Sequence, residues 1–526
     1  MRKKKCALLF VSCSLIYAQQ VSWQKDISTG RQDFLSQVVT TIDQNYLVIG
    51  SSIVKDNAEL AYDYRIVKLS PQGEQRWERT FGGNMHDYLT TAIASQDGSF
   101  LLAGNSYSSK SRDKKDVNKG GSDIWVVKVD ENGKEEWQKS FGTAKNDEVQ
   151  AVVQTTSLGY VIAANLQNHK DGFGSKDIWI IYIDKDGKEL SHLVLGGRSE
   201  DVVKRMIPTK DGGVLLGINS RSDKLENVKA KNTSLNIGEK KLKPTLISKR
   251  TESYGESDYW LVKLDKDGVV EWQRSYGGKG EDQLKTLALT TSGFIVGGES
   301  QSKRSGNKKV DGDGLSNLWV LSLDYNGNEL WQKSYSFGNR DVLKGLQVVS
   351  NAQDSFTKGF LLGGYSETSE NKLPDDETFW MLYIDDKGNE VWRKHIKGIS
   401  KKEEERLNDI KLYKDGSIIL AGSSTDKLGR EGWKIVKLQD SDLQEIVEQL
   451  PIKIYPNPVQ DYCYVEIGFD FKKADILIYD MGGRLLQMVS VNDKITKLDT
   501  KLLVQGAYLV VVKNDQIKVS SKIIKN

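Results

Sequence analysis

Short runs of alternating apolar and polar residues recur along the chain, and each run ends at glycine, aspartate or asparagine. Residues 92–106 (AIASQDGSFLLAGNS) and 287–300 (LALTTSGFIVGGES) each place two such runs around a tight turn. A third run, such as 123–133 (DIWVVKVDENG), passes through another glycine turn into a fourth run. Alternation with a period of two and turns of this chemistry predict β-hairpins. Each unit is therefore expected to be a four-stranded meander.

The unit repeats at a nearly constant interval. Neighbouring fourth runs are 54 to 61 residues apart where the copies are intact, and they open at Trp23, Trp77, Trp137, Trp272, Trp331 and Trp392. The longer gap after Trp137 holds a degenerate copy at 191–197 without the tryptophan, which makes seven copies. Repeats of about 40 to 60 residues with four strands each are typical of propeller blades. The expected fold class is all-β, with a seven-bladed β-propeller at residues 19–440.

Strand counting predicts how the propeller closes. No fourth run follows the last third run at 433–438, whereas residues 21–27 form a fourth run without a unit. The N-terminal strand is therefore expected to complete the last blade, which removes exposed sheet edges. The third runs share a large aromatic residue, with Tyr64 in the first unit, that predicts packing of blade against blade. The others are Trp125, Trp179, Trp260, Trp319, Trp380 and Trp433.

The N-terminal segment is typical of a secretory signal peptide. Residues 2–5 are four consecutive cations, an apolar run follows, and the small residue Ala18 ends it. Residues 1–18 are predicted to be cleaved, although a lipidated Cys13 is an alternative. The apolar run is shorter than the roughly 20 residues that span a bilayer, so no transmembrane segment is expected. Cleavage changes the formal net charge from +3 to −1, which does not favour nucleic acid as a partner.

A change of composition after residue 450 marks a second domain. Residues 441–450 are expected to be a linker, and 451–526 a small Ig-like β-sandwich. This segment carries Tyr455, Pro456, Asn457 and Pro458 in a row, a strand and turn ending in Gly482 and Gly483, and a lysine-bearing last strand. It resembles the type A sorting domain of the type IX secretion system of Bacteroidota.

The resemblance implies that residues 451–526 contact the type IX secretion machinery. It also implies passage across the outer membrane, removal of this domain, and release or attachment at the outer cell surface. The repeat region is similar to the Trp- and Gly-rich arrays of such secreted proteins, which implies a fold and no activity.

Six aspartates follow the starts of the fourth runs by ten residues. They are expected to ring one mouth of the central channel, with a seventh displaced to Asp409. Such a ring is able to bind a cation or a basic ligand, or each carboxylate accepts hydrogen bonds from its own loop. The second role is favoured because binding sites usually depend on differences between blades. The six are Asp33, Asp87, Asp147, Asp201, Asp282 and Asp341.

Calcium is a weaker possibility, and no other cofactor is expected. Residues 184–187, 265–268 and 311–314 resemble the starts of calcium loops. None continues to the bidentate acid that a full loop needs, and the first two coincide with expected hairpin turns. The four histidines, His86, His169, His192 and His395, have no metal-ligand spacing.

Nothing in the sequence predicts a catalytic site. There is no Gly-x-Ser-x-Gly motif, while paired carboxylates remain open. Residues 219–257 form a lysine-rich insertion that is either a flap for an acidic glycan or a solvated excursion. The expected function is a secreted or cell-surface binding or structural module whose ligand is an extracellular protein or carbohydrate. The alternative is a polysaccharide-acting enzyme with carboxylates at the channel mouth.

Overall fold

The computed structural model describes most of the chain after residue 19. The described residues are 20–53, 60–167, 172–225, 235–237, 240–242, 245–312, 316–337, 340–350, 356–367, 379–396, 404–413, 415–425, 430–447 and 451–526. The expected signal peptide at 1–18 lies outside them.

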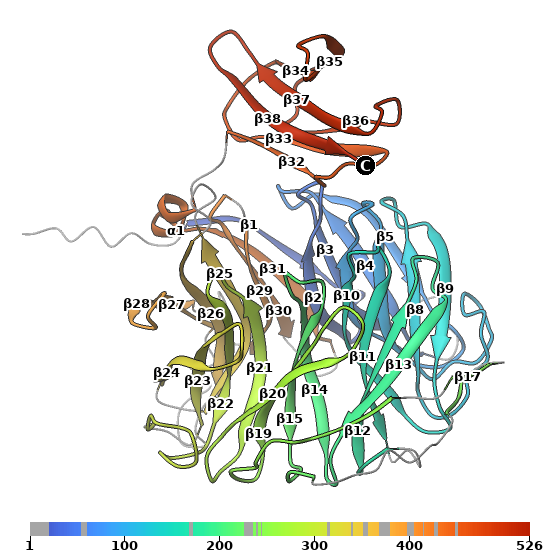
Figure 1. Cartoon of the computed structure of the whole chain (residues 1–526), viewed down its shortest axis with the longest axis vertical. Helices are drawn as coiled ribbons and strands as arrows, with labels where there is room; N and C mark the ends of the chain where they lie inside the picture. Colours follow the sequence, from blue (N-terminus) through green and yellow to red (C-terminus); the bar gives the residue numbers. More distant parts are fainter. Residues whose placement is uncertain are drawn as a thin grey trace, which may run out of the picture.

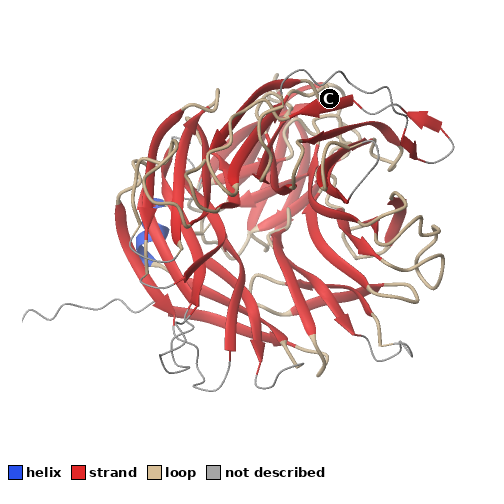
Figure 2. Cartoon of the chain, turned by 90° about the horizontal axis from the view of Figure 1, so that it is seen from below, coloured by secondary structure: helices blue, strands red, loops and turns tan. Residues whose placement is uncertain are grey.

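Most described strands before residue 440 form seven antiparallel sheets, numbered here in chain order. Six of these sheets have four strands, and the third has a fifth strand, β18, beside its four antiparallel strands, while β16 and β17 form a separate pair. Figure 2 shows the sheets fanned around a common centre. Sheet one contains β2 (Asp33–Thr40), β3 (Tyr46–Ile53), β4 (Tyr62–Leu69) and β5 (Gln75–Phe81). Sheet two contains β6 (Asp87–Ala94), β7 (Phe100–Ser106), β8 (Asp123–Val129) and β9 (Glu135–Phe141). Sheet three contains β10 (Asp147–Gln154), β11 (Tyr160–Gln167), β12 (Lys176–Ile183) and β13 (Glu189–Gly196).

The remaining four sheets follow the same plan. Sheet four contains β14 (Asp201–Pro208), β15 (Val214–Ser220), β19 (Asp258–Leu264) and β20 (Val270–Tyr276). Sheet five contains β21 (Asp282–Leu289), β22 (Gly293–Ser300), β23 (Asn317–Asp324) and β24 (Glu329–Tyr335). Sheet six contains β25 (Arg340–Ser350), β26 (Thr357–Glu367), β27 (Phe379–Asp385) and β28 (Glu390–Ile396). Sheet seven contains β29 (Glu404–Leu412), β30 (Ile418–Thr425), β31 (Gly432–Gln439) and β1 (Gln20–Ile27).

The N-terminal strand supplies the fourth strand of sheet seven, as strand counting predicts. β1 runs antiparallel to β31, from the pair Gln20 and Gln439 to the pair Ile27 and Trp433. The first strand of every sheet lies against the first strand of the next, and β29 of sheet seven lies against β2 of sheet one.

The core lies between the sheets. The third strands are buried along their whole length, as in β8 and β19, whereas the fourth strands alternate toward solvent. Each hydrophobic cluster joins neighbouring sheets, as when Leu101 and Val126 of sheet two pack with Tyr160 of sheet three. Apolar burial between sheets therefore supplies the main driving force for their association.

At five of the junctions between sheets, a tryptophan on the fourth strand contacts the next sheet through a hydrogen bond that we call the tryptophan clip. In one clip, the indole N–H of Trp272 donates to the carbonyl of Tyr325, 3.1 Å away in the turn of the next sheet. Gly327 in that turn has φ +75°, and a Cβ there would lie 2.8 Å from the indole. The other clips are Trp23 to Pro71 (2.9 Å), Trp77 to Glu131 (3.1 Å), Trp137 to Lys185 (3.1 Å) and Trp331 to Asp386 (3.0 Å).

The third-strand tryptophans are buried, with at most 1% of each exposed. The ring of Trp125 lies 4.8 Å from that of Tyr64 in the preceding sheet, and the ring of Trp319 lies 5.0 Å from that of Tyr259. The expectation that Tyr64 takes the tryptophan position in sheet one is wrong. In sheet two, the tryptophan Trp125 is paired with Gly104 of the second strand. The equivalent glycine of sheet one, Gly50, is paired with Arg65, so Arg65 occupies the tryptophan position. The Arg65 guanidinium lies 5.1 Å from the centre of the Trp433 ring of sheet seven.

The insertion in sheet four bridges to sheet three. Its described strands are β16 (Leu235–Ile237), β17 (Lys240–Leu242) and β18 (Thr245–Ser248), and β18 runs parallel to β13. β13 is the degenerate copy without a tryptophan, so the strand pairing joins two sheets between which the described residues form no clip. Lys249 is 0% exposed and its Nζ donates to the carbonyl of Ser222 at 2.6 Å. For residues 245–249 the expectation of a solvated excursion is therefore wrong.

The C-terminal segment forms two packed sheets after the short helix α1 (Ser441–Ile446). The sheets share one core that includes Ile454, Val465 and Val510. Their strands are β32 (Ile452–Tyr455), β33 (Tyr462–Ile467), β34 (Ala474–Asp480), β35 (Leu485–Val491), β36 (Ile495–Asp499), β37 (Gly506–Lys513) and β38 (Lys518–Lys525). Figure 1 shows this segment in orange to red at the top of the view, above one end of the repeat sheets.

Candidate functional site

The six repeated aspartates lie at the starts of the first strands and are 0% exposed. The Oδ2 atom of Asp87 accepts hydrogen bonds from Gly83 N at 2.7 Å and from Ser108 Oγ at 2.9 Å. The backbone contact from four residues earlier recurs at the other five, so each carboxylate is bound by its own connecting loop. These contacts are Thr29 to Asp33 (2.7 Å), Thr143 to Asp147 (2.5 Å), Gly197 to Asp201 (2.6 Å), Gly278 to Asp282 (2.7 Å) and Phe337 to Asp341 (2.9 Å).

The expectation that Asp409 is the seventh member of this set is wrong. Leu35 directly precedes the bulge of β2, and Leu407 directly precedes the bulge of β29, so these two residues are equivalent. Asp33 lies two residues before Leu35, and the equivalent residue two before Leu407 is Glu405. Asp409 instead accepts a hydrogen bond from Val38 N at 3.0 Å, across the junction between sheets seven and one.

Three buried lysines, which the sequence analysis missed, accompany the aspartates. Lys308 is 1% exposed, and its Nζ donates to Ser300 Oγ and to the carbonyl of Ser302, both at 2.6 Å. Burial lowers its pKa, and the nearby Asp282 acts in the opposite direction. Burial also lowers the pKa of Lys114 and of Lys249, and the nearby Asp87 and Asp201, respectively, act in the opposite direction. A cation bound at the repeated aspartates would need their carboxylates as ligands. In these three sheets a lysine ammonium group of the protein already lies near that carboxylate.

A regular interval marks these lysines in the sequence. Lys114, Lys249 and Lys308 each precede the start of the next third strand by nine residues. Two of those strands begin with a further buried aspartate, at Asp123 and Asp258. Burial raises the pKa of Asp123, and it raises the pKa of Asp258 to about 6.

The buried Asp147 should make stability depend on pH. Burial raises its pKa from 3.8 to about 7, so the folded state holds the proton more tightly than the unfolded state. The resulting stabilisation is complete below pH 4 and disappears as the pH rises through 7. The variant Asp147→Asn should therefore gain unfolding free energy relative to the parent between pH 4 and 8, by on the order of 4 kcal/mol.

Urea unfolding at pH 4, 6 and 8 checks this prediction. The exposed variant Asp186→Asn is the matched control and should follow the parent at every pH. Parallel curves for Asp147→Asn and the parent would show that Asp147 is ionised in the folded protein.

Five aromatic side chains of sheets one and two gather at the aspartate end of the first strands. We call them the aromatic patch: Phe34, Tyr62, His86, Tyr88 and Tyr107. The Tyr62 ring lies 5.0 Å from Phe34 and 5.4 Å from both His86 and Tyr88, and the Tyr88 ring lies 6.4 Å from Tyr107. Phe34 is 41% exposed and Tyr107 is 38% exposed. Exposed aromatic surface that gathers in one place is the kind of feature that interaction sites often have, and it is therefore a candidate site.

The C-terminal sheets contact the opposite end of the repeat sheets. Tyr455 Oη donates to the carbonyl of Ile42 at 2.8 Å, and Lys497 Nζ lies 3.2 Å from Glu131 Oε2. Ile42 and Glu131 lie in turns at the ends of the strands away from the repeated aspartates. The aromatic patch is therefore on the face that the C-terminal segment leaves uncovered.

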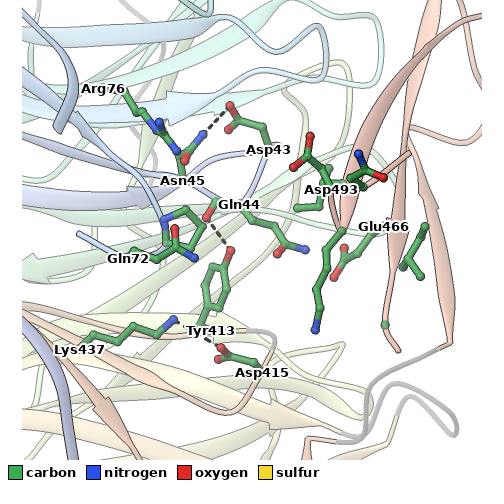
Figure 3. Close-up of a pocket in the computed structure, with 16 residues that line it drawn as sticks. Asp43, Gln44, Asn45, Gln72, Arg76, Tyr413, Asp415, Lys437, Glu466 and Asp493 are labelled. Atoms are coloured by element: carbon green, nitrogen blue, oxygen red, sulfur yellow. Dashed lines mark hydrogen bonds and ion pairs between the residues drawn. The ribbon is translucent and has the colours of Figure 1, made fainter. Parts of the chain in front are cut away.

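A cleft of about 700 Å³ lies between these turns and the C-terminal sheets. On one side, Tyr413 Oη donates to the carbonyl of Gln44 at 2.6 Å, and Lys437 Nζ lies 3.4 Å from Asp415 (Figure 3). Glu466, Asp493 and Lys494 line the other side. The cleft has one wall from each segment, so it exists only while the two are joined.

The expected calcium loops have ordinary turn contacts where they are described. Asp184 Oδ1 accepts from Asp186 N at 3.0 Å and from Lys188 N at 2.8 Å, and Asp265 makes the same pair of contacts. Asp311 accepts from Arg304 N at 2.8 Å, whereas residues 313–314 lie outside the described part. Within the described part, no three His, Cys, Asp or Glu side chains are grouped as metal ligands.

The two histidines whose side chains are described, His86 and His192, lie in or beside different sheets and have different contacts. His86 belongs to the aromatic patch, and His192 is buried with its Nδ1 2.7 Å from Glu189 Oε1. His169 and the side chain of His395 lie outside the described residues.

The motif residues of the C-terminal segment hold its strands and turns. Asn457 Nδ2 donates to the carbonyl of Lys522, and its Oδ1 accepts from Ile524 N, both at 2.9 Å. This residue therefore ties the segment around Pro456 and Pro458 to β38. In the turn after β34, Asp480 Oδ1 accepts from Gly482 N at 3.0 Å, and Gly483 has φ +84°.

Comparison with protein families identifies the C-terminal segment. Residues 453–526 match the family described as the secretion system C-terminal sorting domain. The match confirms the predicted sorting domain. Such a tail implies interaction with the type IX secretion machinery, secretion and attachment to the cell surface. No helix in the described residues is long and apolar enough to cross a membrane.

Comparisons of the whole chain give only distant likenesses. Comparison with curated proteins found no match. Among solved structures, a variant of Synechocystis apocarotenoid oxygenase has 11% identity and a TM-score of 0.38 over 68% of this chain and 71% of that one. A puromycin hydrolase variant has 11% identity and a TM-score of 0.32 over 77% and 61%. The core factor of S. cerevisiae has 8% identity and a TM-score of 0.35 over 80% and 62%.

Proposed function

We propose that residues 19–440 form a seven-bladed β-propeller that is exported by the type IX system and binds an extracellular protein at the aromatic patch. Residues 1–18 would be the signal peptide, 441–450 a linker and 451–526 the sorting domain. The seven numbered sheets are the blades, and the N-terminal strand β1 completes the last one.

Closure of the propeller is supported by two contacts between sheets seven and one. The first strands β29 and β2 lie together as the other first strands do. Trp23 on β1 forms a clip with Pro71 of sheet one, as tryptophans do at four other junctions. The junction between the last and first sheets therefore has the same two contacts as the four other junctions that have a clip.

The aromatic patch carries the functional proposal. Tyrosine, phenylalanine and methionine are enriched at the centres of protein interfaces, where they supply large contact areas at a low entropic cost. The exposed Met85, which is 51% exposed, lies beside His86 in the chain. The patch also lies away from the sorting domain, so a partner has access to it before and after export.

The alternative of a polysaccharide-acting enzyme has less support. It requires carboxylates that meet a substrate at the channel mouth, whereas the six repeated aspartates are buried and bonded to their own loops. We therefore assign these aspartates a structural role, and we assign none to the cleft, because removal of the sorting domain would abolish it.

Removal of the patch side chains should weaken partner binding at least tenfold. The double variant Phe34→Ala/Tyr107→Ala truncates two exposed rings of the patch, which is expected to cost about 1.5 to 3 kcal/mol of binding free energy. A partner is first captured from the surface proteome of the producing cell, and its Kd is then measured for the parent and for each variant.

The matched control is Tyr325→Ala, because Tyr325 is 40% exposed but lies at the opposite end of the strands. It should bind like the parent. A partner that binds the patch variant with unchanged affinity, or a glycan array signal that depends on the patch without any protein partner, would refute the proposal.

A further inference from the structure

Each first strand carries a bulge at the same place, and the bulge leaves one residue of that strand without an opposite partner. At two of these positions a short polar side chain reaches the neighbouring first strand. Ser36 Oγ donates to the carbonyl of Leu89 at 2.5 Å, and Asn408 Nδ2 donates to that of Leu35 at 3.0 Å. The bulged residues are Ser36, Thr90, Gln150, Lys204, Lys285, Lys344 and Asn408.

Three consecutive sheets have lysine at this position, while the other four have neutral polar residues. Lys204, Lys285 and Lys344 belong to sheets four, five and six, and the first strands β14, β21 and β25 that carry them lie side by side. The charges act on one another: Lys285 contributes to a lowered pKa of both Lys204 and Lys344, in which burial is the larger cause.

The cluster has an excess of positive charge. Lys285 Nζ lies 3.6 Å from Glu299 Oε2 and donates to Gln283 Oε1 at 3.0 Å. No described carboxylate lies within ion-pair distance of Lys204 or Lys344. The ammonium group of Lys344 lies over the ring of Tyr365, 5.5 Å from its centre. Arg205 adds a fourth cation, fixed by a 3.2 Å hydrogen bond from its Nε to the carbonyl of Lys285.

The arrangement breaks the repeat in a way that structure alone does not require. Ser36 and Asn408 show that a short neutral residue satisfies the bulge through the neighbouring backbone. Half-buried like charges repel one another and lose hydration. Glu299 offsets only one of the three lysine charges, so the remaining positive charge destabilises this part of the fold unless a further anion binds there. Lysine is a point-charge ligand for oxyanions.

We propose that Lys204, Lys285 and Lys344 form a binding site for an oxyanion among the first strands of sheets four to six. The shared ligand chemistry is that of sulfate, phosphate or a carboxylate group. The site is independent of the aromatic patch, which belongs to sheets one and two, and it does not rest on the proposed protein partner.

The test uses the full chain without residues 1–18 and measures thermal unfolding and isothermal titration with sodium sulfate and sodium phosphate, against chloride at equal ionic strength. The parent should bind at least one of these anions saturably, and its unfolding midpoint should rise by several degrees. Lys204→Gln/Lys344→Gln should weaken binding at least tenfold. Without the anion, this variant should melt at or above the parent's midpoint, because repulsion is relieved.

The exposed pair Lys134→Gln/Lys139→Gln removes the same charge from sheet two and should respond like the parent. A parallel titration with glucuronate distinguishes a carboxylate of a sugar from a free inorganic anion, and binding of either kind that depends on Lys204 and Lys344 supports the site. Phe34→Ala/Tyr107→Ala should retain the anion response, which separates this test from that of the partner. Equal responses of the parent and the lysine variant, or no response of the parent to any of the three anions, would overturn the proposal.

Discussion

Deletion of residues 20–27, which form β1, is expected to lower the free energy of unfolding by on the order of 5 kcal/mol. The strand pairs with β31 along its length, and Ile27 at its end is only 6% exposed. Trp23 also makes the clip that joins sheet seven to sheet one. Without β1, the edge of β31 lies open, which promotes association between molecules.

Thermal unfolding and size-exclusion chromatography measure this effect, and the midpoint should fall by roughly 10 °C. Trp23→Phe removes the indole N–H and leaves the strand in place, so it should cost only about 1 kcal/mol. If the deleted protein melted with the parent, the N-terminal strand would have no part in closing the structure.

The second large effect is expected for Trp319→Ala, at about 3 to 5 kcal/mol of unfolding free energy. The side chain is fully buried and packs against Tyr259 across the junction of sheets four and five. Its indole N–H donates to Gln332 Oε1 at 3.2 Å, and truncation leaves that acceptor and a large cavity behind.

Trp331→Ala is the matched control for this core position. Trp331 lies on the fourth strand of the same sheet and is partly exposed. Because part of its surface already meets water, truncation should cost roughly half as much. Urea unfolding curves of the two variants compare them, and an equal loss would mean that burial at the third strand does not control the stability of the junction.

Much of the strand arrangement follows from the sequence because each strand type has a recurring residue. Tryptophan marks the fourth strands, aspartate marks the starts of the first strands, and glycine turns separate the third from the fourth. The unmatched fourth run at 21–27 was sufficient to place β1 beside β31, and the composition after residue 450 was sufficient to place the sorting domain.

The errors arise where one copy has a different residue at a repeated position. Sheet seven has glutamate where the other first strands have aspartate, so Asp409 appeared to be a ring member displaced by the charged insertion, although Glu405 holds the position. In sheet one, Arg65 replaces a tryptophan, and the neighbouring Tyr64 resembled that tryptophan more closely in the sequence. Only the pairing of Gly50 with Arg65 corrects the assignment.

The candidate sites required the fold. Phe34 and Tyr107 meet because sheets one and two are adjacent, although many residues separate them in the chain. Lys204, Lys285 and Lys344 stand out only when the bulges identify them as members of one structural position. The buried Lys114, Lys249 and Lys308 could have been predicted from the sequence, because each lies at the same interval before a third strand.

The tryptophan clips have a consequence for spectroscopy. The six fourth-strand indoles are partly exposed, whereas the six third-strand indoles are buried. A water-soluble collisional quencher therefore reaches one half of the fluorophores and not the other. Five of the partly exposed indoles each form a clip at a single junction. Replacing one of these five tryptophans by phenylalanine therefore removes the emission that reports on its junction. The protein thus carries built-in optical probes with which the opening of individual sheet junctions is followed without any added label.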